Sequence, residues 1–322
     1  MSRIVLAALS TYCLLDLAVS VLVAIIWRTR AMAPTDLPPI VRARRLLQLR
    51  LVPGVAAGAI TLLVALPAFA MFEPTDVEEN IGPLFVLLAV GALAQWIIAI
   101  VIAARSIWLT RSVEREWLRR SRAIEASRSA GLRAFAIESS SPMVALVGVL
   151  APKLIASTSV VNACTAGEIA CIAGHERGHF DARDNLKRWI MASLPDMLRW
   201  TPMHHEIVDA WHHAAEDAAD DATTGGEPIA RAELAALLLK VVRLAPAPSW
   251  NAAVISPFVE QHGLDRRIRR LLQPELEPPA PLAIIPLIAV TALSIAMLAA
   301  LSSAAALQLI FNTIEDLVAF GR

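Results

Sequence analysis

The sequence predicts a mainly α-helical membrane protein with four transmembrane helices and a soluble α+β domain that contains a small β-sheet. Three observations support this fold class. The 322-residue chain is 57% hydrophobic, has a mean hydropathy of +0.58 and is only 18% charged, unlike an ordinary soluble domain. Four apolar runs are each long enough to cross a bilayer. A long polar stretch separates the third run from the fourth.

Three of the apolar runs lie near the N-terminus and form a predicted membrane domain, residues 1–104. The first run is too long for the apolar part of a signal peptide, so we expect it to be retained. The fourth run lies in the C-terminal part, residues 282–322, and would leave a short external tail. The predicted spans are residues 4–27, 51–72, 82–104 and 282–311.

An acidic residue, Asp16, falls near the middle of the first span. An ionisable group at that depth is costly and needs a partner, or else marks a functional site. We favour a protonated carboxyl that is hydrogen-bonded to a neighbour such as Gln95 of the third span.

The basic segments predict the topology. Segments rich in arginine precede the second span, follow the third and precede the fourth, and such segments stay on the cytosolic side. The predicted arrangement is a multi-pass protein of the inner (plasma) membrane with its N-terminus outside and residues 105–281 in the cytosol. The chain has three cysteines, and so small and odd a number predicts no disulfide framework. A formal net charge of zero gives no indication of a nucleic-acid partner.

The soluble part, residues 105–281, begins with an amphipathic helix that continues the third span over Ser106–Arg128. Its arginines either contact anionic headgroups or form a solvated face. Three β-like runs follow, at Arg133–Glu138, Val144–Leu150 and Leu154–Ser157. An exposed edge of their sheet can hold a peptide by strand addition, although a purely structural hairpin fits the sequence equally well.

The central motif of the chain is His175-Glu176-Arg177-Gly178-His179, on a helix whose start is marked by a capping box from Thr165 to Glu168. Residues four apart share one face of a helix, so both imidazoles can bind one Zn²⁺. Glu176 lies beside that site, where it can take a proton from water. A chance pattern on a metal-free helical bundle is the alternative.

A catalytic zinc needs a third protein ligand, and the helix from Met203 to about Thr223 offers many candidates. We favour Glu216, because Asp220 shares its face and can accept a hydrogen bond from a ligand imidazole. Asp184, just after the motif helix, is a second candidate for that supporting role. The alternative is a polar helix that is simply solvated.

These strings resemble the integral-membrane gluzincins. Arg183-Asp184-Asn185-Leu186 is similar to the BlaR/MecR-type antirepressor peptidases, and Glu216-x-x-Ala219-Asp220 is shared with the HtpX/Ste24-type membrane peptidases. The resemblance implies a gluzincin-like peptidase domain with one Zn²⁺ per chain, bound by His175, His179 and Glu216. Glu176 would be the general base, and the substrate would be a protein or peptide.

The BlaR/MecR sensors carry an external penicillin-binding domain after the fourth span, whereas only eleven residues follow Phe311 here. We therefore do not expect this chain to sense β-lactams itself, and a separate sensor or repressor partner would be needed. The leading hypothesis is a zinc endopeptidase in signalling that cleaves a cytosolic or juxtamembrane protein, such as a repressor or itself. A quality-control peptidase and a non-catalytic scaffold with a structural metal site are the alternatives.

The reaction also needs a donor for the oxyanion. The only tyrosine, Tyr12, lies in the first span and cannot serve. Four histidines of the Met203 helix remain as candidates: His204, His205, His212 and His213.

Overall fold

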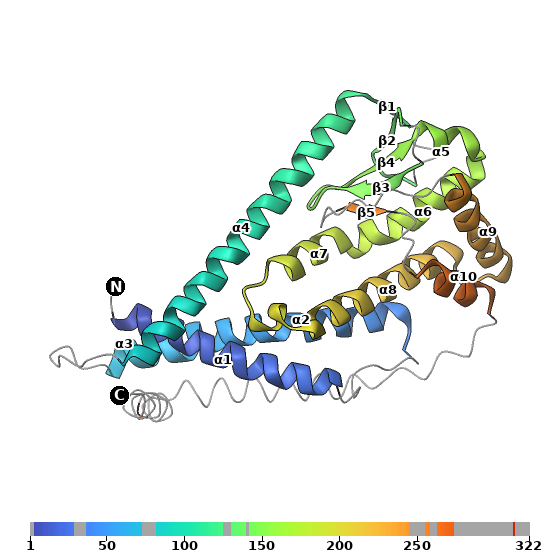
Figure 1. The fold of residues 1–322 in the computed structure, drawn as a ribbon. Coiled ribbons are helices and arrows are strands. Elements are labelled where there is room, and N and C mark those ends of the chain that lie inside the picture. The colour runs from blue at the N-terminus through green and yellow to red at the C-terminus, as the bar shows by residue number, and fades with distance from the viewer. Residues whose placement is uncertain are drawn as a thin grey trace.

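The structure is a computed structural model that describes residues 3–28, 37–72, 82–124, 130–139, 142–244, 255–257, 263–273 and 312. The predicted fourth span, residues 282–311, and residues 313–322 after it lie outside the described residues. The described part is a mainly helical chain with a small mixed sheet (Figure 1).

Three helical stretches of the described residues are long and apolar enough to cross a membrane, and they lie where the first three spans were predicted. The second is continuous from α2 through a short π-helical segment into α3. Pro67 lacks an N–H group, which removes one helical hydrogen bond at this point and accounts for the wider turn. The elements are α1 (Arg3–Arg28), α2 (Pro39–Ile60), the π segment (Thr61–Ala65), α3 (Leu66–Phe72) and α4 (Pro83–Arg119).

Two of these helices extend beyond the apolar runs. α2 begins at Pro39, so part of the arginine-rich segment before the second span is helical. α4 continues the third span into the soluble part, as predicted, but it ends at Arg119 and not at Arg128. The residues after it form a strand, β1 (Ser121–Ala123). The sequence did not indicate this strand, because three residues are too few to show the alternation of apolar and polar side chains. Val113 and Trp117 of α4 pack against the sheet.

The sheet has five strands in the order β1-β2-β4-β3-β5. The three predicted strands are confirmed as β2 (Ala134–Ile137), β3 (Val144–Val147) and β4 (Lys153–Ser157). Alternate side chains of β3 face opposite ways: Val144 and Leu146 join the core beneath α6 and α9, and Ala145 and Val147 face α4. The fifth strand, β5 (Ile255–Pro257), was not among the three strands predicted from the sequence.

β5 pairs antiparallel with β3 and occupies the edge that β3 would otherwise expose. The sequence left open whether a sheet edge holds a peptide or the strands form a purely structural hairpin, and the edge of β3 is not exposed. Because β5 comes from the same chain, the position of an added strand is already filled by residues 255–257.

Of the remaining helices, α5, α6 and α9 lie beside the sheet, and α7 and α8 lie between α4 and α2 (Figure 1). Their bounds are α5 (Thr158–Ala163), α6 (Ala166–Ala182), α7 (Asp184–Ser193), a 3₁₀ turn (Met197–Trp200), α8 (Pro202–Thr224), α9 (Pro228–Leu244) and α10 (Leu264–Leu272).

The connection between α7 and α8 packs among the membrane helices. Asp16 accepts a hydrogen bond from Gln95 at 3.3 Å, as predicted, and a shorter one from the backbone N–H of Met197 at 2.7 Å. Tyr12 donates to the Pro195 carbonyl. Residues 195–197 therefore lie against the middle of the first span, although the sequence placed all of 105–281 in the soluble part.

A buried ion pair joins the same connection to α2. Arg50 and Asp196 are 0% and 1% exposed, and their side chains meet at 2.6 Å. Arg50 also donates to the His204 ring at 2.8 Å and to the Met191 carbonyl at 3.1 Å. This guanidinium thus connects α2, the end of α7 and the start of α8.

Arg50→Ala is expected to destabilise the protein by about 3–5 kcal/mol, because it leaves the Asp196 carboxylate buried without its counter-charge. Thermal unfolding of the full chain in detergent measures the loss. Arg44→Ala, at an exposed position of the same helix, is the control and should leave the melting temperature unchanged. Equal melting of both variants would contradict the role given to this ion pair.

Candidate metal centre

The motif helix α6 is defined at both ends by local chemistry. The Thr165 hydroxyl accepts from the Glu168 N–H at 3.2 Å, and the Glu168 carboxylate accepts from the Thr165 N–H at 2.7 Å, so the predicted capping box is confirmed. At the other end Arg183 adopts the left-handed conformation with φ 56°. This break turns the chain so that Asp184, the first residue of α7, lies beside the C-terminal end of α6.

The two motif histidines face each other inside the protein. His175 and His179 are 0% and 1% exposed, and their Nε2 atoms are 3.2 Å apart. Each Nδ1 atom meets a carboxylate: His175 lies 3.1 Å from Asp220, and His179 lies 2.8 Å from Asp184. The Nε2 atoms are thus directed at one common point, which is the arrangement of metal-binding imidazoles that are oriented by carboxylates.

Glu216 of α8 completes this group. Its carboxylate oxygens lie 3.5 Å from the Nε2 atom of His175 and 3.3 Å from that of His179. One ligand atom from each of the three residues falls within 4.8 Å of the others. The residues present therefore fit a metal ion with two imidazole ligands and one carboxylate ligand.

The close approach of α6 and α8 explains how Glu216 reaches the histidines. A Cβ atom on Gly178 would lie 3.2 Å from the Cα atom of Ala219, so a larger residue in either helix would push them apart. The small residue inside the His-Glu-x-x-His motif therefore sets the spacing of the two helices that supply the ligands.

Glu176 is fully buried, at 0% exposure. Neither of its carboxylate oxygens has a hydrogen-bond partner among the described residues. Burial raises the pKa of this carboxyl above its ordinary value, against the opposing effect of His179 and His175. A buried carboxylate without a partner is expensive for the fold and suits a group that exchanges a proton with a bound molecule.

The site attracts positive charge. Burial alone would lower the pKa of His179, but Glu216 and Asp184 raise it to about 10. Burial opposes the charged form of His175 in the same way, and Asp220 with Glu216 outweighs it. A cation held between these side chains would take the place of the bound protons.

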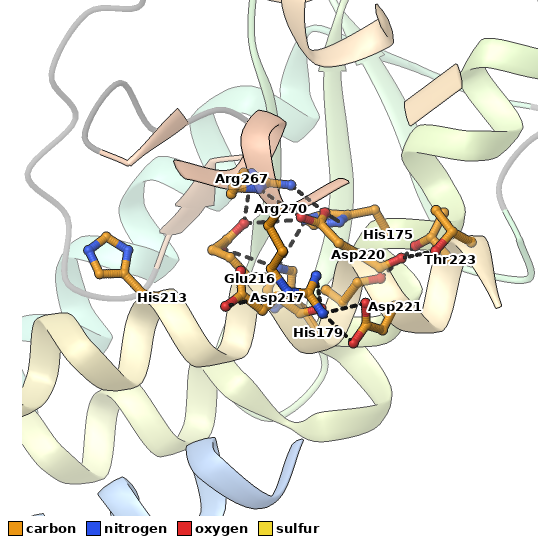
Figure 2. Close-up of polar contacts among 12 residues, drawn as sticks. His175, His179, His213, Glu216, Asp217, Asp220, Asp221, Thr223, Arg267 and Arg270 are labelled. Carbon is orange, nitrogen blue, oxygen red and sulfur yellow. Dashed lines mark hydrogen bonds and ion pairs between the residues drawn. The ribbon is translucent and has the colours of Figure 1, made fainter. Parts of the chain in front are cut away.

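Two arginines that the sequence analysis missed balance the carboxylates. Arg267 of α10 is 4% exposed, binds Asp220 at 2.6 and 3.0 Å and lies 3.0 Å from Glu216 (Figure 2). Arg188 of α7 is 7% exposed, lies 3.7 Å from Glu216 and stands over the Trp211 ring. Neither arginine could be recognised from the sequence, because a surface arginine and a buried counter-charge look the same there.

The predicted alternative of a solvated α8 is wrong on this face. Glu216 is 6% exposed, and Asp217 and Asp220 are 0% exposed. Asp217 pairs with Arg42 of α2 and with Arg266 of α10, so this one carboxylate joins α8 to two other helices.

The four candidate histidines of α8 occupy different places. His204 binds Arg50, far from the motif, and His205 is exposed and lies beside His204. His213 lies against Gly263, apart from the group around Glu216 (Figure 2). His212 packs edge-on to Trp211, and burial together with Arg188 lowers its pKa to about 3, so this imidazole is neutral.

A family model described as BlaR1 peptidase M56 matches residues 4–271 of the chain. The chain belongs to this family. The match begins in the first predicted span and ends in α10, so it covers both the apolar helices and the residues of the candidate metal centre. A search of the curated proteins found no match.

Membership makes this protein a membrane metallopeptidase and confirms the BlaR/MecR side of the resemblance. The HtpX/Ste24 side has no support beyond the Glu216-x-x-Ala219-Asp220 string.

Asp184→Ala is expected to weaken zinc binding about 10-fold to 100-fold, because the His179 ring loses the carboxylate that orients it. Competition with a chromophoric chelator measures the affinity. Asp181→Ala is the matched control, since it removes the same charge three residues earlier from an exposed pair with Arg177. An unchanged affinity in Asp184→Ala would show that this carboxylate does not support the site.

Proposed function

We propose that this member of the BlaR1 peptidase family is a zinc-dependent endopeptidase that acts in signalling on a cytosolic or juxtamembrane protein. The observation that supports it most is the buried, unpartnered Glu176 carboxylate beside two imidazoles that turn their Nε2 atoms toward each other. A structural metal site has no need of such a carboxylate. For that reason we favour an enzyme over a non-catalytic scaffold.

His175, His179 and Glu216 would hold the zinc ion. Bound there, zinc supplies Lewis-acid chemistry that polarises a peptide carbonyl and makes water acidic. Glu176 takes the proton from the attacking water and delivers it to the amine that leaves when the peptide bond breaks. Its raised pKa helps it to hold that proton between the two steps.

The carbonyl oxygen gains negative charge during the attack and needs a donor. Arg188 is the strongest candidate, because its buried Nε–H has no hydrogen-bond partner among the described residues. His212 is the second, since its neutral ring lies close to Arg188 and Glu216. The positions of His204, His205 and His213 argue against this role for them.

Two observations bear on the substrate. β5 fills the edge of β3 where an extended peptide would be added, which favours a segment of the chain itself as one substrate. In addition, Glu216 lies twelve residues after His204, about 18 Å along α8. Because His204 binds Arg50 at the membrane helices, Glu216 lies close enough to the membrane for a juxtamembrane protein to reach it.

We place the chain in the plasma membrane, where the arginine-rich segments favour a peptidase domain in the cytosol and an N-terminus outside. In that arrangement a cytosolic repressor can reach the metal centre, and a separate sensor protein can contact the membrane helices. A quality-control peptidase would share the chemistry and differ in its substrates.

Glu176→Gln is expected to keep its zinc and to lose proteolysis by at least about 100-fold, because the amide cannot accept the proton. Metal analysis of the purified protein and comparison of protein fragments in cells with wild type or Glu176→Gln test both parts. Fragments that depend on Glu176 identify the substrate.

His175→Ala is the companion variant and should lose both zinc and proteolysis. Proteolysis at the wild-type level in Glu176→Gln, or wild-type protein that binds no zinc, would overturn the proposed function.

A further inference from the structure

A hollow of about 650 Å³ lies along α4, where the helix leaves the third span, and Lys153 of β4 closes its other side. We call it the α4 hollow. The residues of α4 that line it are spaced three and four apart and so form one face of the helix. They are Ala104, Ile107, Trp108, Arg111, Glu114, Arg115 and Leu118.

The α4 hollow is positively charged, and part of that charge is unmatched. Glu114 is neutralised by Lys153, which leaves two exposed guanidiniums, Arg111 and Arg115. Neither has an acidic partner among the described residues, and Arg115 donates only to the Arg111 carbonyl. By contrast, Arg119 and Arg120, further along the same helix, both pair with Glu116.

The same face of α4 continues as bare apolar surface into the span. Leu93, Ile97 and Ile100 are 44%, 52% and 61% exposed, at the spacing that leads to Trp108. Trp108 is itself 64% exposed, and tryptophan prefers the boundary between the hydrocarbon and the headgroups. An apolar strip, an aromatic side chain and two arginines thus follow one another along the helix.

The position of Arg111 along the membrane normal fits contact with a lipid headgroup. Arg111 lies seven residues past Ala104, about 10 Å along a helix, and the headgroup layer is about 5–8 Å thick. α4 diverges from α1 and α2 as it leaves the span (Figure 1), so its rise along the membrane normal is smaller than its length. A long arginine side chain can also reach back toward the interface.

We propose that the α4 hollow binds the headgroup of an anionic glycerophospholipid, with Arg111 and Arg115 on the phosphate and the acyl chains along the apolar face of α4. Charge complementarity selects an anionic lipid over a neutral one, and the apolar strip selects a lipid over a free phosphate. This site is separate from the metal centre and does not depend on proteolysis.

Native mass spectrometry of the delipidated full chain in detergent tests the proposal, with dioleoyl phosphatidylglycerol and dioleoyl phosphatidylcholine as probes. The wild type should bind phosphatidylglycerol more tightly than phosphatidylcholine. The double variant Arg111→Gln with Arg115→Gln should bind phosphatidylglycerol roughly 10-fold to 30-fold more weakly, since two basic contacts are lost. Both positions are exposed, so folding is preserved and elution should stay monodisperse.

The matched control is Arg119→Gln with Arg120→Gln, which removes the same charge from the same helix outside the hollow and should bind like the wild type. Equal loss in both double variants would overturn the proposal in favour of diffuse attraction. Equal binding of the two lipids by the wild type would overturn it as well. Complete displacement of phosphatidylglycerol by inorganic phosphate would assign the arginines to a free anion.

Discussion

The balance of buried charge around α8 is the constraint on which the rest of the structure depends. Charges inside a protein are tolerated only when they are paired or bind a metal. Glu216, Asp217 and Asp220 satisfy that rule through imidazoles and arginines from four other helices. These ion pairs fix the position of α8 among α2, α6, α7 and α10. The geometry of the candidate ligands follows from the packing of those four helices around α8.

The sequence predicted what local rules encode. A capping box, an i,i+4 histidine pair and long apolar runs each have a period or a position that needs no distant partner, so α6 and the first three spans are where they were expected. The pairing of Glu216 with Asp220 could be predicted because residues four apart share one face of a helix, and that face was expected to turn toward the two histidines. A face that is turned toward a buried site is itself buried.

What could not be predicted depends on contacts between distant segments. β1 and β5 are three residues each and exist only because β2 and β3 pair with them. Arg188 and Arg267 look like surface arginines until the carboxylates they meet are placed. The end of α4 at Arg119 also depends on a distant contact, because Ser121–Ala123 pairs with β2 in the sheet instead of continuing the helix. The roles of the metal ligands remain predictions that metal analysis can test.

The connection between α7 and α8 shows that the membrane helices and the peptidase domain are not separable pieces. Arg50, Tyr12 and Asp16 all bind residues of this connection. A fragment cut out at residues 105–281 would expose the Asp196 carboxylate and the Met197 amide without their partners. Because Arg50 of α2 binds both Asp196 and His204, the first turn of the helix that carries Glu216 is fixed to the apolar helices, and these helices are part of the scaffold of the candidate metal centre.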